Sequence, residues 1–153
     1  ETDLLVKNQI PVILSPAGNS TLSANTTMND WDPYDTPYVT PALLKRTGVK
    51  FCFQTDDYAN SHQLRSRVGE SCAYGLPVDT ALRSITLTAA EILGVADQIG
   101  SITPGKLGNL VISDGDPFEM TSCIRYVFVK GQPVPLTSKW TRLRDQYLQR
   151  VGG

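Results

Sequence analysis

The sequence predicts an α/β fold, because two short strand-like runs flank a helical segment in its first third. Residues 10–16 (IPVILSP) and 49–55 (VKFCFQT) are rich in β-branched and aromatic side chains, which is typical of buried strands. Residues 40–48 (TPALLKRTG) open on a capping threonine and a first-turn proline and close on glycine, as a short helix would. A strand, a helix and a strand in that order indicate a βαβ unit with parallel strands.

Three more helices are expected after residue 60. The first, residues 60–76, repeats Leu, Val and Cys at a four-residue spacing. The second, residues 77–87, has a proline in its first turn, and the third is the short segment 88–94. In this last helix Thr88 and Glu91 have the spacing of a capping box, in which each side chain accepts a backbone N–H of the first turn.

Beyond residue 94 the pattern changes to short strands separated by Pro-Gly, Asp-Gly and Lys-Gly turns. Strands are expected at 109–113 and 124–130, in an antiparallel sheet separate from the first strand pair. The tail returns to a helix with one apolar stripe of Trp140, Leu143, Tyr147 and Val151. The chain is therefore expected to divide into residues 1–94, 95–135 and 136–153.

Residues 100–106 (GSITPGK) have the spacing of a phosphate-binding loop, but the residues around them do not suit that chemistry. Leu107 stands where a Ser or Thr would bind Mg²⁺, and Pro104 removes a backbone N–H from the loop. A strand also follows where phosphate binding needs the N-terminus of a helix. We therefore interpret this segment as a β-turn.

Composition narrows the range of partners. The 153 residues are 41% hydrophobic with a net charge of −1 and no cluster of Lys and Arg, which argues against nucleic-acid and membrane partners. No apolar run approaches the roughly 18 residues of a membrane span. Cys52, Cys72 and Cys123 lack disulfide or metal-ligand spacing, so we expect buried reduced thiols and a reducing compartment such as the cytoplasm. The first residues lack Met and a capping signal, as expected of a chain cut from a longer one.

The second expected strand ends on two adjacent carboxylates, Asp56 and Asp57. Side chains alternate along a strand, so Asp56 shares a face with Cys52 and Gln54 while the phenylalanines share the other. Ligands bind at the carboxyl ends of parallel strands, which makes Asp56 the stronger candidate, whereas Asp57 could cap the next helix. His62, the only histidine, is interpreted as a surface or capping residue, since one imidazole cannot supply a zinc site.

The chain resembles the carboxyl-terminal part of the amidohydrolase superfamily, in its imidazolonepropionase-related branch, through GVKFCFQTDD, AYGLPVDTALRSITLTAAEILGVADQIGSITPGKLGNLVISDGDPF and VFVKG. The resemblance implies the last strands and helices of a (β/α)8 metal-dependent hydrolase barrel plus part of a small β-sandwich domain. Residues 10–16 would be the seventh barrel strand and 49–55 the eighth, with sandwich strands from about residue 95. A complete barrel takes about 250 residues, so this chain would hold its last quarter.

The same resemblance implies a role for Asp56. In the family, the Asp that ends the eighth strand contacts a divalent metal, here expected to be zinc, and takes a proton from the metal-bound water. That water attacks a carbonyl or amidine carbon of a small-molecule substrate, and a carbon–nitrogen bond other than a peptide bond is broken. Because the remaining metal ligands would lie upstream, the fragment alone is expected to bind no metal tightly and to be inactive.

Two other interpretations stay open. The chain could be a non-catalytic α/β module that binds a partner through unpaired strand edges, or an inactive amidohydrolase-like scaffold that acts by binding. A partial barrel also leaves strand edges and apolar faces uncovered, and such edges pair readily with other chains. We therefore expect a homo-oligomer with contacts at residues 10–14 and at the sandwich strands.

Overall fold

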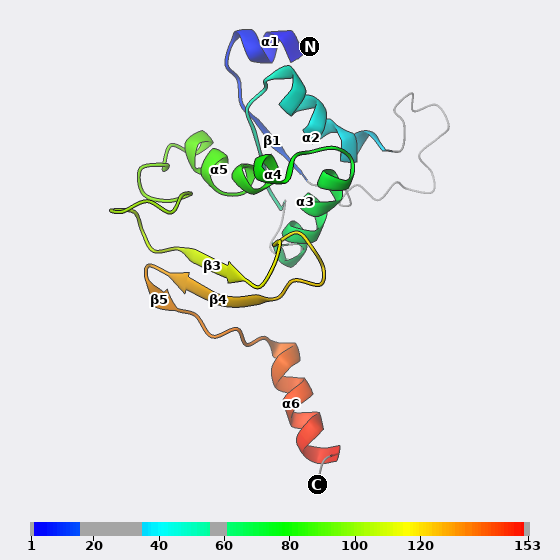
Figure 1. The fold of residues 1–153 in the computed structure, drawn as a ribbon, viewed down its shortest axis with the longest axis vertical. Coiled ribbons are helices and arrows are strands. Elements are labelled where there is room, and N and C mark those ends of the chain that lie inside the picture. The colour runs from blue at the N-terminus through cyan, green and yellow to red at the C-terminus, as the bar shows by residue number, and fades with distance from the viewer. Residues whose placement is uncertain (1, 16–34, 56–60, 152–153) are drawn as a thin grey trace.

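The computed structural model describes residues 2–15, 35–55 and 61–151, and it is an α/β fold (Figure 1). The helices are α1 (Thr2–Lys7), α2 (Thr36–Thr47), α3 (Leu64–Ala73), α4 (Val78–Ser84), α5 (Leu87–Ile92) and α6 (Lys139–Val151), with a 3₁₀ turn η1 (Ser61–Gln63) before α3. The strands are β1 (Val12–Leu14), β2 (Phe51–Phe53), β3 (Leu110–Ser113), β4 (Ile124–Val129) and β5 (Gln132–Pro133). Along the described part of the chain, no helix is both long and apolar enough to cross a bilayer.

Strands β1 and β2 form a parallel pair, which confirms the βαβ prediction. Val12 lies opposite Phe51 and Leu14 opposite Phe53. The backbone N–H of Val12 donates to the Lys50 carbonyl at 2.9 Å, so the pairing begins before the first residue of β2. Helix α2 connects the two strands in the sequence, and α3, α4 and α5 follow beside them (Figure 1).

The core lies on the face of this pair that carries the phenylalanines. The rings of Phe51 and Phe53 meet edge to face with centroids 5.8 Å apart. Val68 of α3 is fully buried there, and Leu64 and Cys72 pack beside it, which confirms the predicted four-residue stripe. The buried cluster consists of Ala42, Leu44, Val49, Phe51, Phe53, Val68, Leu76, Ala81 and Phe118. Burial of these side chains is the main force that holds the helices on the strands.

Helix α2 begins four residues earlier than the sequence predicts. Thr40 is not its cap but an interior residue, whose Oγ1 donates to the Thr36 carbonyl at 2.6 Å. Pro37 occupies the first turn, where a missing N–H costs nothing, and Pro41 lies inside the helix. The predicted end is confirmed, because Gly48 adopts the left-handed conformation with φ 81° that closes helices.

The predicted capping box at Thr88 and Glu91 is wrong. Helix α5 starts at Leu87, so Thr86 is the cap residue and Thr88 lies inside the helix. The Oγ1 of Thr86 donates back to the Leu82 carbonyl at 2.6 Å instead of capping α5. The Glu91 carboxylate forms an ion pair with Lys50 at 2.8 Å, and this lowers the pKa of Glu91. Glu91 is therefore the ion-pair partner of Lys50 and does not cap α5.

Two more helix limits differ from the predictions. The segment expected to be helical from residue 60 starts as the η1 turn, and the α-helix itself begins at Leu64. The helix expected over 77–87 ends at Ser84, because residues 85–86 form a turn into α5. The Ser84 hydroxyl donates to the Ala81 carbonyl at 2.6 Å at this end.

Strands β3, β4 and β5 form a separate antiparallel sheet, as predicted for residues 109–113 and 124–130. Lys130 and Gly131 both have positive φ, 51° and 77°, and they make the two-residue turn between β4 and β5. Asn109 accepts the Lys130 N–H through Oδ1 at 2.8 Å, which secures the turn against the start of β3.

The antiparallel sheet is joined to the helices through the loop after β3. Phe118 from this loop is buried in the core cluster, and Gly69 of α3 lies directly against it. A Cβ at Gly69 would be 3.0 Å from the Phe118 carbonyl oxygen, so a larger residue there would require the loop to shift by a few tenths of an ångström. Arg65 adds a hydrogen bond from Nη1 to the Ser122 carbonyl at 3.1 Å. The antiparallel sheet is therefore anchored to the core through its loop residue Phe118, while its own strands contribute no residue to the buried cluster.

The segment 100–106 is a turn, as predicted. The Lys106 N–H donates to the Thr103 carbonyl at 3.2 Å, and Gly105 has φ 92°. The Lys106 ammonium is bound within its own loop, where it donates to the Ala96 carbonyl and to the Ser101 hydroxyl, the latter at 2.7 Å. Because this ammonium group is hydrogen-bonded within the loop, it is not placed to bind a phosphate as the motif suggests.

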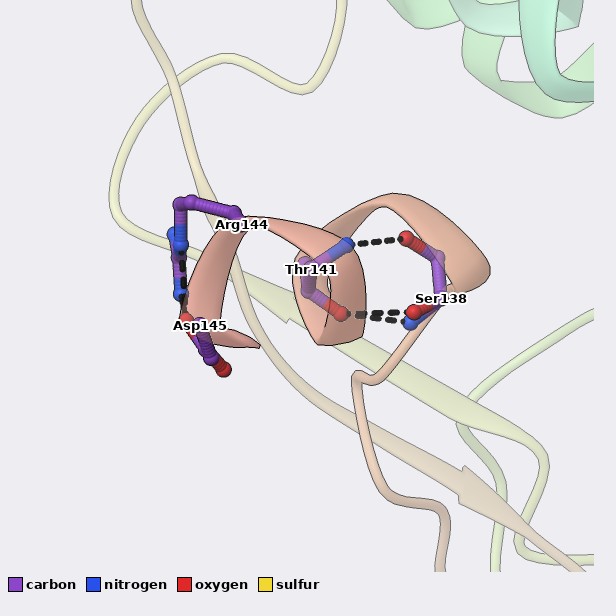
Figure 2. A network of polar contacts seen from close by, with 4 residues as sticks. All are labelled: Ser138, Thr141, Arg144 and Asp145. Carbon is purple, nitrogen blue, oxygen red and sulfur yellow. Dashed lines mark hydrogen bonds and ion pairs between the residues drawn. The ribbon is translucent and has the colours of Figure 1, made fainter. Parts of the chain in front are cut away.

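Helix α6 leaves the body of the molecule after an exposed segment and extends away from it (Figure 1). Its first turn is capped by Ser138 and Thr141 (Figure 2). The Ser138 Oγ accepts the Thr141 N–H at 3.2 Å, and the Thr141 Oγ1 accepts the Ser138 N–H at 2.8 Å. This reciprocal cap starts the helix without help from tertiary contacts.

Candidate site at the carboxyl ends of β1 and β2

The strand pair β1–β2 has one face on the core and an opposite, partly open face, which is exposed at β1 but buried at Cys52 of β2. Val12 and Leu14 pack against the core beside the phenylalanines. Between them Ile13 points the other way and is 49% exposed, and it lies directly opposite Cys52. Exposure therefore alternates along β1, whereas all three residues of β2 are buried, so the alternation predicted for residues 49–55 is not seen as a difference in burial.

The open face ends in a polar pair. The Gln54 amide donates from Nε2 to the Ser15 hydroxyl oxygen at 3.2 Å, and its backbone N–H donates to the Leu14 carbonyl at 2.9 Å. Ser15 and Gln54 are each the first residue beyond their strands, and both are exposed. Polar side chains at this end of parallel strands are where ligands of α/β proteins bind.

Asp56 and Asp57 lie outside the described residues, which stop at Thr55 and resume at Ser61. The choice of Asp56 over Asp57 as the carboxylate on the open face therefore stays a prediction. The prediction assumes that the phenylalanines of the strand face the core and that Gln54 faces away from it. The structure agrees with this assumption, because Phe51 and Phe53 are in the core cluster and Gln54 is exposed.

His62 is an exposed residue of the η1 turn. Its Nε2 lies 3.4 Å from the Nε2 of Gln63, and neither residue provides a side-chain cap for α3. The surface interpretation of His62 is thus confirmed and the capping one is not. Among residues 2–15, 35–55 and 61–151, no three His, Cys, Asp or Glu side chains come together to hold a metal ion.

The cysteines divide between buried and exposed environments. Burial raises the pKa of the Cys52 thiol, and burial together with the Asp116 carboxylate raises the pKa of Cys72. Both thiols therefore stay protonated and unreactive near neutral pH. Only Cys52 is fully buried, while Cys72 is half-buried and Cys123 is exposed, which corrects the prediction that all three are buried. The backbone N–H of Cys123, and not its thiol, makes the hydrogen bond that the structure shows, to the Asp114 carboxylate.

Sequence reasoning missed Ser15. It follows a strand of only three residues, and its relation to Gln54 depends on the pairing register of two distant segments. One signal was present, because Ser15 and Gln54 each lie near the carboxyl end of a predicted strand, and parallel strands end at the same edge of a sheet.

A cleft of about 230 Å³ opens at the other end of β2, near Lys50 and Phe51. Lys45 and Arg83 also line it, at the C-terminal ends of α2 and α4. The partial negative charge at the C-terminal end of a helix favours nearby cations, which accounts for Lys45 and Arg83. Lys50 forms an ion pair with Glu91, so none of the three cations needs a bound ligand to explain it. The cleft is separate from the candidate site, which lies at the carboxyl ends of the strands.

Comparison with known proteins agrees with this fold. The profile of the amidohydrolase family matches residues 39–134, more than half of the chain. A solved amidohydrolase from Thermotoga maritima superposes with a TM-score of 0.73 at 28% identity, over 88% of this chain and 33% of that one. The chain therefore belongs to the amidohydrolase family, which confirms the resemblance seen in the sequence.

Two curated relatives show the range of similar proteins. The chain is 37% identical over 92 residues to adenine deaminase 1 of Latilactobacillus sakei, which covers 56% of this chain and 14% of the relative. It is 36% identical over 83 residues to the imidazolonepropionase of Sphingopyxis alaskensis, which covers 50% of this chain and 20% of the relative. The matched regions thus span a fifth or less of these relatives.

Proposed function

We propose that this chain is the carboxyl-terminal part of a metal-dependent amidohydrolase that hydrolyses a non-peptide carbon–nitrogen bond in a small molecule. The observation that carries the proposal is the open face of β1–β2, which ends in Ser15 and Gln54 two residues before Asp56. The family match adds to it, and the deaminase and imidazolonepropionase relatives support the carbon–nitrogen bond class.

In this proposal Asp56 contacts the metal and acts as the general base. Its carboxylate accepts the proton that water loses as the oxygen attacks the substrate carbon. A bound divalent metal, which we expect to be zinc, supplies a lowered water pKa near 7 and a positive charge for the developing oxyanion. Asp57 would point to the other face if the alternation of the strand continues.

The described residues do not fit a metal site by themselves. We propose that the further metal ligands lie upstream, in a longer protein that contains this chain. We accordingly propose that the isolated chain binds no metal tightly and hydrolyses nothing. Elemental analysis of the purified chain tests this. Stoichiometric zinc at a site made only of these residues would contradict it.

The role of Asp56 is tested by a pair of substitutions in an active full-length protein that contains this chain. Asp56→Asn keeps size and shape but removes charge and basicity, so kcat should fall by about 10²- to 10⁴-fold while the fold survives. Asp57→Asn is the matched control, with the same chemical change one residue away, and should lower kcat much less. Metal content measured on both variants separates loss of the base from loss of the metal.

The outcomes distinguish the alternatives. Turnover within a few-fold of wild type in both variants would exclude Asp56 as the base. Equal large losses would mean that the parity of the strand is wrong. A full-length protein that binds substrate analogues but turns over no carbon–nitrogen substrate would favour the inactive scaffold, and one that binds only a protein partner would favour the non-catalytic module.

We further propose that the chain forms a homo-oligomer through the open edge of β1. Ile10 and Ile13 are both about half exposed, and β1 is paired only with β2 within the described residues. Exposed strand edges with apolar side chains associate readily. A monodisperse monomer by light scattering at high concentration would contradict this proposal.

A further inference from the structure

Helix α6 has an apolar face with no partner in the structure. None of its thirteen residues is buried, and it extends from the body after β5 (Figure 1). Trp140 is 75% exposed, Tyr147 59% and Val151 83%. Exposure of such an apolar helix face to water is unfavourable, so the face indicates that the helix binds to another surface.

The apolar side chains of α6 occupy one side. At 100° per residue, Leu143, Tyr147, Trp140, Val151 and Leu148 follow one another around the helix in that order. Gln149 lies opposite Trp140, and Lys139 and Arg150 lie at the edge of the apolar side next to Leu143. Both cations lie beside aromatic rings, Lys139 at 5.9 Å from the Trp140 centroid and Arg150 at 5.6 Å from that of Tyr147.

Positive charge is concentrated in this helix. It carries four cations and one carboxylate, Asp145, for a net charge of +3. The rest of the chain carries ten cations and fourteen carboxylates, for a net charge of −4. The near-neutral total charge, which by itself argues against a membrane partner, is therefore the sum of a cationic helix and an anionic body.

Arg144 distinguishes the surfaces that α6 could cover. It falls within the apolar side, between Val151 and Leu148, and its guanidinium contacts only the neighbouring Asp145 among the interactions that the structure shows (Figure 2). In an apolar protein groove this charge would need a buried acidic partner. At a lipid surface, an arginine at this position extends its guanidinium to the phosphate groups while its methylenes stay with the apolar side chains.

From these observations we propose that α6 binds the surface of an anionic phospholipid membrane, with its axis parallel to the bilayer plane. Cations at the edge of the apolar side and Trp and Tyr within it are the pattern of helices that lie in this interface. The body would remain in water, where its negative charge is repelled by the same surface. The proposal concerns attachment and is independent of the catalytic assignment of Asp56.

Vesicle co-sedimentation of a full-length protein that contains this chain tests the proposal, and it also shows whether the rest of the protein covers α6 instead. Vesicles of equal parts phosphatidylcholine and phosphatidylglycerol should retain the chain, and vesicles of phosphatidylcholine alone should retain much less. Trp140→Ser should weaken binding by about tenfold or more, because it removes the largest apolar side chain. Arg150→Gln should weaken binding to the anionic vesicles about fivefold, and added salt should weaken it further.

Gln149→Ser is the matched control, because it places the same residue on the opposite side of α6 and should leave binding unchanged. All three positions are exposed, so the thermal unfolding of the body should be the same in each variant. Equal retention by the two kinds of vesicle, or retention by neither, would overturn the proposal. It would also be overturned if Trp140→Ser turned a dimer into a monomer without any effect on vesicle binding, because a second copy would then cover α6.

Discussion

Gln54 donates a hydrogen bond to Ser15 at 3.2 Å across the carboxyl ends of β2 and β1. The two residues come from segments that are joined by α2 and the residues before it, and the contact exists only in the parallel register of the two strands. It is the polar end of the open face on which the proposed function rests.

A double-mutant cycle should detect this contact. Ser15→Ala and Gln54→Ala should be coupled by about 0.5–1 kcal/mol in the free energy of unfolding, the low end for a hydrogen bond because water competes at exposed groups. Urea unfolding of the two single variants and the double variant measures the coupling. Gln54→Ala combined with Leu93→Ala serves as the control and should be additive. Coupling equal to zero in the first cycle would mean that the hydrogen bond does not persist in solution.

Gly100 and Gly105 allow a matched test of close packing. Both have φ 92°, but a Cβ at Gly100 would lie 2.8 Å from the Cβ of Ala90, and one at Gly105 would meet nothing within 4 Å. Gly105→Ala should cost about 1–2 kcal/mol for the left-handed backbone alone. Gly100→Ala should cost roughly 1–3 kcal/mol more, because α5 must also move. Equal losses in denaturant unfolding would show that the two loops do not differ in packing.

Stability should depend on the charge of Asp114. The Cys123 N–H, at 2.7 Å, and the Arg125 guanidinium hold the pKa of Asp114 below its usual value of 3.8. A lowered folded-state pKa stabilises the fold above the usual value, and this contribution is lost as the pH falls through the folded-state pKa. Asp114→Ala should therefore lower the melting temperature at pH 7, and the difference from wild type should shrink below about pH 3.8.

Arg125→Gln is the companion variant for Asp114. It removes the ion pair and leaves the Cys123 amide bond in place, so its effect at neutral pH should be smaller than that of Asp114→Ala. A difference between wild type and Asp114→Ala that did not change with pH would mean that the variant acts through packing rather than charge.

Ser138 should determine how well α6 forms. Ser138→Ala removes the oxygen that accepts the Thr141 N–H and should destabilise the helix by about 0.5–2 kcal/mol. NMR chemical shifts of the first turn should move toward coil, while thermal unfolding of the body stays unchanged, because no α6 residue is buried. Ser138→Asp keeps an acceptor and should restore the helix. A loss of body stability would show that α6 packs on the body in solution.

The core cluster predicts a large difference between two leucines. Leu76 is almost fully buried in the cluster, so Leu76→Ala should cost about 2–5 kcal/mol in unfolding free energy. Leu93, after the end of α5, is 67% exposed, and Leu93→Ala should change stability by no more than about 0.5 kcal/mol. Urea unfolding measures both. Similar effects at the two positions would contradict the packing of the core.

Local chemistry was enough to predict most elements of this fold. The burial of Phe51 and Phe53, the glycine end of α2, the turn at Gly105 and the Lys-Gly turn after β4 each depend on a few neighbouring residues. Because hydrophobic period and turn preference act over such short distances, the sequence by itself predicted a parallel strand pair and a separate antiparallel sheet.

Only the tertiary structure decided which distant groups meet. Glu91 pairs with Lys50 instead of capping α5, Ser15 joins Gln54, and Phe118 enters the core against Gly69. These outcomes depend on the register of strands and on how tightly the chain packs, which no local preference encodes. The unpartnered face of α6 is the opposite case, since its stripe was evident in the sequence but its separation from the body was not. A helix of thirteen residues is only marginally stable alone in water, so its stability depends on the surface that it packs on, and only the tertiary structure shows whether the body supplies that surface.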